Sequence, residues 1–221
     1  MPPPPHRLTM ALLQQGLAAV AAADAEVAAG LAAVGPPPEL RTVEPGLPGL
    51  LRIMVGQQVS SASARAIWRR IETAVVPLDA PTLIAALGLP QEALGLSRPK
   101  RAYARGLAEA MIAGAFDPEA LPALPNDAAI TAITALKGFG RWSAAIYLLF
   151  ALGRPDAWPS DDLALAVAVQ RLKGFSARPS RQEVDRIAET WQPWRGAMAT
   201  FLWHYYHRTG GQAQFADRVE A

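Results

Sequence analysis

The sequence predicts an all-α protein, and three of its features support this fold class. Apolar residues recur at helical spacings of three and four positions along most of the chain. Alanine-rich stretches such as 18–29 and 128–135 favour helix. No run of alternating apolar and polar residues convincingly marks a strand. We therefore expect roughly ten helices joined by short loops.

The N-terminal part of the chain is predicted to be helical after a proline-rich start. Pro2–Pro5 are expected to be disordered or polyproline-like, which leaves 1–6 outside the fold. Apolar residues then follow helical spacing from Leu8 to Leu31. The glycine and prolines at 35–38 end this segment, and we place the first domain boundary after them.

The middle of the chain is predicted to be a series of helices separated by glycine, proline and capping residues. A helix over 47–55 is followed by an interruption at 56–60, after which Ser60 or Ser61 can cap the next helix. Asn126 is the capping candidate for a helix that ends near Leu136. Shorter helices are expected between these two regions, at 82–87, 91–94 and 98–113.

The last third of the chain begins with a tight turn at 137–140, followed by an apolar helix over 141–152 and a loop over 153–159. Three more helices follow, and each has its own start signal. They are 160–174, which opens on Ser-Asp-Asp and ends on a glycine cap, a helix to Trp191 that opens on the capping box Ser180-x-x-Glu183, and 193–210, which opens on proline.

The composition limits the size of the core and the kinds of reactive site that the chain can form. The chain has 221 residues, of which 51% are hydrophobic and 18% charged, enough for a sizeable core in one large or two small domains. The absence of cysteine excludes disulfides, thiolate zinc sites, iron–sulfur clusters and cysteine nucleophiles. A formal net charge of +2 permits a nucleic-acid partner but does not by itself argue for one.

No targeting segment is evident in the sequence. Its start lacks a basic region followed by an apolar run, and no apolar stretch is long and charge-free enough to span a bilayer. We therefore expect a cytoplasmic protein without a membrane partner.

The segment 136–144, Leu-Lys-Gly-Phe-Gly-Arg-Trp-Ser-Ala, joins two expected helices through a Gly-x-Gly turn. Gly138 and Gly140 let the backbone approach a ligand closely. The N-terminus of the second helix is suited to a phosphate, and Arg141 or Lys137 can add charge. A helical corner that simply favours glycine is the alternative explanation.

This segment resembles the helix–hairpin–helix motif of the HhH-GPD DNA glycosylases, Leu-Pro-Gly-x-Gly-x-x-Thr-Ala, with Lys137 replacing the proline and Ser143 the threonine. The resemblance implies that Ser143 belongs to a DNA-binding hairpin. It also implies that backbone carbonyls of the hairpin hold a monovalent cation, Na⁺ or K⁺, that bridges to a DNA phosphate. By position these carbonyls belong to Thr134, Leu136 and Phe139. No other cofactor is expected.

Two carboxylates, Asp161 and Asp162, lie at the start of an expected helix, where the helix dipole stabilises an acid. Ordinary capping explains either one. In the family that the hairpin resembles, a catalytic aspartate follows a Gly/Pro-rich loop after the hairpin, and this position falls on Asp162. Asp161 is then the capping candidate. One carboxylate suits the chemistry, because cleavage of a nucleoside bond builds positive charge on the sugar and a cationic alkylated purine leaves as a neutral base.

The segment Gly56-Gln57-Gln58-Val59-Ser60 resembles the family's Gly-Gln-Gln-x-Ser loop, which contacts DNA and fills the gap left by a flipped base. Gln58 is the candidate plug, and Gln57 is a candidate contact to the opposite strand. A polar helix break with a capping serine is the alternative.

The densest basic cluster comprises Arg98, Lys100, Arg101 and Arg105. It suits either a phosphate backbone or a solvated helix face.

The C-terminal region is rich in aromatic residues, and Trp194 and Phe201 are expected in the core. The pattern Trp-x-Pro-Trp-Arg followed by Trp203 resembles the C-terminal helix of the alkylpurine branch of the family. The resemblance implies that Trp203 faces a flipped cationic base, with cation–π stacking worth about 1–2 kcal/mol. Trp142 is a second candidate wall of this base pocket, and Ile146 stands where the branch often has another aromatic residue.

The resemblance implies two helical subdomains with the active-site cleft between them. We expect a discontinuous subdomain, 1–42 plus 156–221, and a central one, 43–155. The expected function is release of alkylated purines of the 3-methyladenine type from double-stranded DNA by a monomeric, cytoplasmic, nucleoid-associated bacterial DNA-repair enzyme. Family members that also cut the strand use a lysine at the position of Trp142, so the expected enzyme is monofunctional. A glycosylase for oxidised or deaminated bases and a non-catalytic DNA-binding module are the alternatives.

Overall fold

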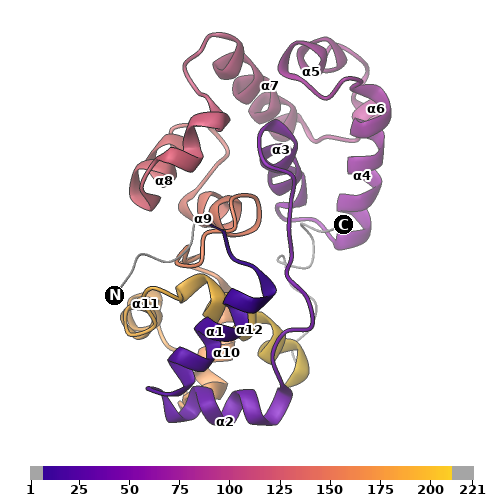
Figure 1. Cartoon of the computed structure of the whole chain (residues 1–221). Helices are drawn as coiled ribbons and strands as arrows, with labels where there is room; N and C mark the ends of the chain where they lie inside the picture. The colour runs from indigo at the N-terminus through magenta and orange to yellow at the C-terminus, as the bar shows by residue number, and fades with distance from the viewer. Residues whose placement is uncertain (1–6, 211–221) are drawn as a thin grey trace. The chain divides into compact units, whose positions relative to one another are not determined.

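The computed structural model describes residues 7–210, and this part of the chain is all-helical, as predicted (Figure 1). The expected disorder of Pro2–Pro5 concerns residues outside the described range. Between residues 7 and 210 the helices are α1 (Met10–Ala21), α2 (Ala25–Val34), α3 (Leu47–Gly56), α4 (Ser61–Ala74), α5 (Ala80–Ala86), α6 (Gln91–Leu94), α7 (Arg98–Ile112), the 3-10 helix η1 (Pro118–Ala123), α8 (Asn126–Thr134), α9 (Arg141–Phe150), α10 (Leu163–Leu172), α11 (Arg181–Glu189) and α12 (Arg195–Arg208).

The described chain divides into two compact units. Of the described residues, one unit holds 7–42 together with 148–210, and the other holds 43–147. The second boundary thus falls inside α9, whereas the sequence interpretation placed it in the loop after this helix, between 155 and 156. A loop is the natural boundary to read from glycine and proline content, but packing rather than composition decides which unit a residue joins.

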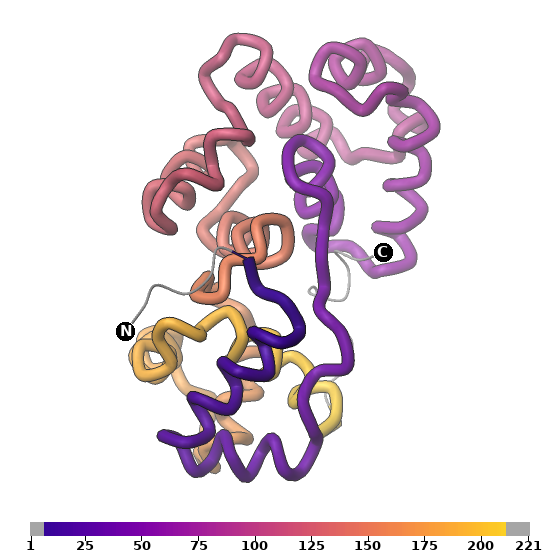
Figure 2. The backbone as a smooth tube through the Cα atoms, in the orientation of Figure 1, coloured from indigo at the N-terminus to yellow at the C-terminus, as the bar shows by residue number. Residues whose placement is uncertain are grey.

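The first unit is built around the C-terminal helix α12. α10 packs along it, and the N-terminal helices α1 and α2 also contact it, as the indigo and yellow turns in Figure 2 show. Leu13, Leu17, Val169 and Phe201 are among the almost completely buried side chains of this core. Burial of each such side chain stabilises the fold by about 1.5–3 kcal/mol.

Asp24 ties three parts of the first unit together. It caps α2 by accepting the Val27 N–H at 3.1 Å. The Lys173 ammonium lies 2.7 Å from its Oδ2, and the Trp191 indole N–H donates to the same oxygen at 3.1 Å. Burial raises the pKa of Asp24, but these hydrogen bonds outweigh it and hold the pKa below the ordinary value. The charged form of Asp24 therefore stabilises this unit.

The second unit packs α5 against α7, and α4 against α3 and α6. Tyr147, on α9, is fully buried, and its hydroxyl accepts the Gly46 N–H at 2.8 Å just before α3 begins. Burial raises the pKa of Tyr147. This contact fixes the start of α3, the helix that leads into the glutamine loop.

Local start signals set most helix ends as expected. Ser60 caps α4, Gly174 takes a left-handed conformation (φ 67°) after α10, and Ser180 and Glu183 form the capping box of α11. The Asn126 expectation was wrong, because Pro125 holds the cap position with extended backbone and Asn126 is the first helical residue.

The opening of the last helix differs as well. It starts at Arg195 rather than at Pro193, because the non-helical Trp194 (ψ 20°) occupies its cap position.

Candidate functional site

The hairpin between α8 and α9 has two glycines in different local surroundings. Gly138 has a φ of 95°, and a Cβ there would lie 2.4 Å from Cγ of Tyr103 on α7. Only glycine fits this conformation and contact without strain. A Cβ at Gly140 would meet nothing within 4 Å, so the backbone there is open to an approaching group. Of the two glycines, Gly140 is therefore the one suited to close phosphate contact.

Gln57 and Ser143 bind each other inside the second unit. The Gln57 side-chain amide donates to the Ser143 hydroxyl at 3.1 Å and to the Gly138 carbonyl at 3.0 Å. Ser143 is only 4% exposed. These bonds join the glutamine loop to the hairpin, so both motifs form one assembly. DNA contacts by Gln57 and Ser143 stay predictions.

Gln58 is exposed and has a left-handed backbone, with a φ of 55°. This conformation costs a non-glycine residue about 1–2 kcal/mol. The loop is held from the α7 side by Lys100, whose ammonium donates to the carbonyls of Val55 and Gln57, both at 2.7 Å. Burial lowers the pKa of Lys100. A held loop that presents an exposed side chain on a strained backbone suits the plug role expected of Gln58.

Most of the basic cluster on α7 is engaged within the protein. Lys100 binds the glutamine loop, the Arg101 guanidinium donates to the Leu87 and Leu89 carbonyls, and Arg105 lies 3.9 Å from Glu109. This leaves Arg98 as the exposed member of the cluster. The structure therefore favours a mainly structural role for these basic side chains.

The hairpin carbonyls expected to hold a cation have spare acceptor capacity. Among the described residues, the Thr134 and Phe139 carbonyls accept no hydrogen bond, and the Leu136 carbonyl accepts one, from the Phe139 N–H at 3.1 Å. A carbonyl oxygen has two lone pairs, so all three oxygens can still bind a ligand. Oxygen ligands of this kind fit a hard monovalent cation. Lys137 and Arg141 are exposed beside them.

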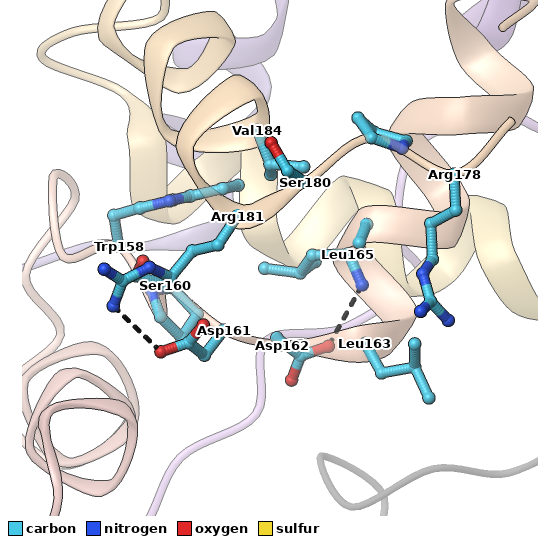
Figure 3. Close-up of a pocket in the computed structure, with 13 residues that line it drawn as sticks. Trp158, Ser160, Asp161, Asp162, Leu163, Leu165, Arg178, Ser180, Arg181 and Val184 are labelled. Atoms are coloured by element: carbon cyan, nitrogen blue, oxygen red, sulfur yellow. Dashed lines mark hydrogen bonds and ion pairs between the residues drawn. The ribbon is translucent and has the colours of Figure 1, made fainter.

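In the first unit, Asp162 directly precedes α10 and caps it. Its Oδ1 accepts the Leu165 N–H at 3.0 Å (Figure 3). The same oxygen accepts the Trp203 indole N–H at 3.3 Å. The interpretation of Asp161 as the capping residue was wrong. Because α10 begins at Leu163, the cap position falls on Asp162. Asp161 instead has a φ of 70° and an ion pair with Arg181 at 3.1 Å.

Trp203 is 2% exposed, and its ring packs against Phe150 with centroids 5.6 Å apart. Its indole N–H donates to Asp162, so the buried ring helps to fix the position of that carboxylate. Its stacking on a flipped base stays a prediction. Trp142, the other candidate wall, is half-buried in the first turn of α9, and Ile146 is fully buried one turn later.

The loop that carries Asp162 is held by polar contacts that were not predicted from the sequence. The Trp158 indole N–H donates to Asp185 at 2.9 Å, and the Ser160 hydroxyl contacts both oxygens of the same carboxylate, at 2.8 and 2.7 Å. Trp158 and Ser160 border a hollow of about 220 Å³ that Asp162 and Arg181 also line (Figure 3). The contacts join residues 25–27 positions apart, and no local pattern signals them.

The described residues include no side-chain cluster suited to a metal ion. Between residues 7 and 210, no group of three or more histidine, aspartate or glutamate side chains is placed to hold a metal ion. The His204 imidazole contacts the Val34 carbonyl at 3.2 Å. In the same range, every helix is too short or too polar to cross a membrane.

The chain matches known proteins along most of its length. Residues 51–193 match the HhH-GPD superfamily base excision DNA repair protein family. DNA-3-methyladenine glycosylase 1 of Schizosaccharomyces pombe is 32% identical over 158 residues, which cover 70% of this chain and 69% of that protein.

Solved structures agree with this match. The Schizosaccharomyces pombe 3-methyladenine DNA glycosylase in complex with abasic DNA superposes with a TM-score of 0.74 at 26% identity, covering 86% of this chain and 95% of that one. A DNA-3-methyladenine glycosidase from Bacillus halodurans gives a TM-score of 0.74 at 26% identity, with coverage of 85% and 87%. The matched segment contains the glutamine loop, the hairpin and Asp162, so this chain belongs to the HhH-GPD superfamily of base excision DNA repair proteins.

Proposed function

We propose that this protein is a monofunctional DNA glycosylase that releases alkylated purines of the 3-methyladenine type from double-stranded DNA. The observation that carries the proposal is Asp162, a carboxylate held at a helix N-terminus by two donors, in a chain of this family. The names of its relatives, which are 3-methyladenine glycosylases, support the substrate class.

The reaction needs one carboxylate. As the bond between the sugar and the base breaks, its electron pair leaves with the base and positive charge develops on the sugar. Asp162 stabilises this charge, and water adds to the sugar carbon while its proton passes to the carboxylate or to solvent. An alkylated purine carries its own positive charge, so it leaves as a neutral base without a second acid. Phosphate binding needs no such carboxylate, so a non-catalytic DNA-binding module would use Asp162 only as the cap of α10.

The hairpin and the glutamine loop are the proposed DNA-binding elements. We place the phosphate at Gly140 and the N-terminus of α9, with Arg141 nearby, because this backbone is open. The carbonyls of Thr134, Leu136 and Phe139 would hold a Na⁺ or K⁺ ion, which supplies positive charge for the phosphate. We further propose that the protein acts as a monomer in the cytoplasm of a bacterium, on the DNA of the nucleoid.

A panel of duplexes, each with one modified base, tests this function by measuring base release. Release of 3-methyladenine and 7-methylguanine is expected, and release only of 8-oxoguanine or uracil would support the oxidised- or deaminated-base alternative. Asp162→Asn keeps an oxygen for the Leu165 and Trp203 donors but removes the charge, so release should fall at least about 100-fold. Asp79→Asn is the matched control, because Asp79 likewise caps a helix, by accepting the Thr82 N–H at 2.8 Å. Unchanged release by Asp162→Asn would remove this residue from the mechanism.

A further inference from the structure

We propose that Asp185, on α11, is a positioning residue that holds the loop carrying Asp162 in its catalytic place. The proposal rests on the proposed function of Asp162. Asp185 uses both carboxylate oxygens for this loop: the Trp158 indole N–H donates to it at 2.9 Å, and the Ser160 hydroxyl lies 2.8 and 2.7 Å from its two oxygens. Hydrogen bonds to a carboxylate are shorter and stronger than those between neutral groups.

The face of α11 that carries Asp185 contacts the loop at a second point. Arg181 lies one helical turn before Asp185, on the same face, and its guanidinium pairs with Asp161 at 3.1 Å. The side chains of this pair are 51% and 59% exposed, so it contributes less than about 1 kcal/mol. Figure 3 shows Arg181 reaching from α11 to Asp161, beside Asp162. Asp185, which is half-buried, therefore provides the stronger of the two attachments.

The loop needs an external attachment because its backbone is strained next to the catalytic residue. Asp161 has a φ of 70°, a conformation that costs a residue with a side chain about 1–2 kcal/mol. Such strain persists only where surrounding contacts enforce it. From Leu163 onward the backbone is fixed by α10, and up to Ser160 it is fixed by Asp185. Asp162 lies between these fixed segments, so loosening one of them shifts its carboxylate.

The effect on the reaction should be large and confined to the chemical step. A displacement of about 1 Å at a catalytic group can cost on the order of 100-fold in rate. Asp185→Ala should therefore slow single-turnover release of 7-methylguanine by about 10- to 100-fold. The Kd for a duplex with a tetrahydrofuran abasic-site analogue should stay within about twofold, since Asp185 is not among the proposed DNA contacts.

Three further variants separate positioning from general stability. Asp185→Asn retains one acceptor and should recover part of the rate that Asp185→Ala loses. Ser160→Ala should slow release in the wild-type background but have little further effect in the Asp185→Ala background, because the two residues act through one contact. Gln182→Ala, an exposed change on the same helix, should behave as wild type. All rates are measured well below the melting temperature of each variant.

The outcomes are distinct. If wild-type protein releases alkylated bases and Asp185→Ala matches Gln182→Ala, Asp185 is not a positioning residue and the proposed function survives. Parallel losses of rate and DNA affinity in proportion to the unfolded fraction would equally overturn the positioning role. If Asp185→Ala does not fold, Ser160→Ala and Trp158→Phe decide the question by the same rate and affinity measurements. If wild-type protein releases no base, the proposed function and this inference both fail.

Discussion

Substitutions at the two hairpin glycines should have different effects, one on DNA binding and the other on the stability of the fold. Gly140→Asp is expected to leave the fold intact, because Gly140 directly precedes α9, its carbonyl accepts the Ala144 N–H at 3.0 Å, and a Cβ there has open space. Aspartate is a favoured residue at such a cap position. The new carboxylate would, however, occupy the place proposed for a DNA phosphate and repel it.

The expected loss of affinity follows from the contacts at stake. A hydrogen bond to a charged group is worth about 1.5–3 kcal/mol, so losing one of them weakens DNA binding by about 10- to 100-fold. The loss should be similar for damaged and undamaged duplexes, because phosphate contacts carry no sequence information. The slope of log Kd against log salt concentration should also decrease by about one, as expected for the loss of one phosphate contact.

Gly138→Ala should instead destabilise the fold. Its φ of 95° costs about 1–3 kcal/mol for a residue with a side chain, and the Cβ would lie 2.4 Å from Tyr103. Overpacking of this kind adds about 1–3 kcal/mol. A total of about 2–6 kcal/mol corresponds to a fall in Tm of roughly 4–24 °C for a chain of this size.

Thermal unfolding and fluorescence anisotropy with a labelled duplex at several salt concentrations measure both effects. Gln15→Glu, an exposed change on α1, controls for the loss of net positive charge. Wild-type affinity in folded Gly140→Asp would refute the phosphate site. A Gly138→Ala variant as stable as wild type would refute the steric argument for that glycine.

Further predictions concern three other positions of the chain. With Trp142 at the lyase position, borohydride should trap no covalent protein–DNA adduct, and a robust adduct would contradict the monofunctional assignment. Trp203→Phe should slow base release about 5- to 10-fold by removing the N–H that contacts Asp162. Trp203→Ala should reduce release of cationic methylpurines more than release of hypoxanthine, whereas equal losses would mean that the residue acts only through packing or Asp162. Asp24→Asn should lower the free energy of unfolding by about 2–4 kcal/mol at pH 7, because Lys173 stays part-buried without its partner. Folding lowers the pKa of Asp24. The difference in unfolding free energy between wild type and Asp24→Asn should therefore be complete above pH 3.8, the ordinary pKa, and should vanish as the pH falls through the pKa of the folded protein. Urea titrations at pH 7 and below pH 4 can measure this difference.

The sequence was sufficient to predict features governed by neighbours along the chain. Helical periodicity, the capping box at Ser180 and the glycine end at Gly174 depend on residues within one or two turns, and the structure agrees with each. The hairpin and the family were also predictable, because the hairpin motif is a short string with fixed spacing.

Features that depend on distant contacts could not be predicted in this way. The inward orientation of Gln57 requires Gly138 and Ser143, which are 81 and 86 positions away. The choice between the two aspartates at the start of α10 depended on a single residue of helix register. Periodicity does not fix helix ends that closely, and Asp161 was therefore assigned a cap that Asp162 provides.

The two functional loops share one physical arrangement. Among residues 7–210, only Gln58 and Asp161 combine a side chain with a left-handed backbone, with φ values of 55° and 70°. Gln58 is itself the proposed plug, and Asp161 adjoins the proposed catalytic aspartate. Each loop is held by one part-buried charged side chain from another helix, Lys100 on α7 or Asp185 on α11.

Backbone strain of this kind is lost as soon as a loop relaxes, so it survives only where other contacts enforce it. The charge types match the groups presented, since an ammonium can donate to several carbonyls and a carboxylate can accept from several donors. Conservative changes at the two holding residues should therefore differ in outcome. Arginine at Lys100 can still donate to carbonyls, whereas asparagine at Asp185 loses one of the two oxygens that contact the loop. The strained positions thus point to the residues that hold each site in place, even where no sequence motif marks them.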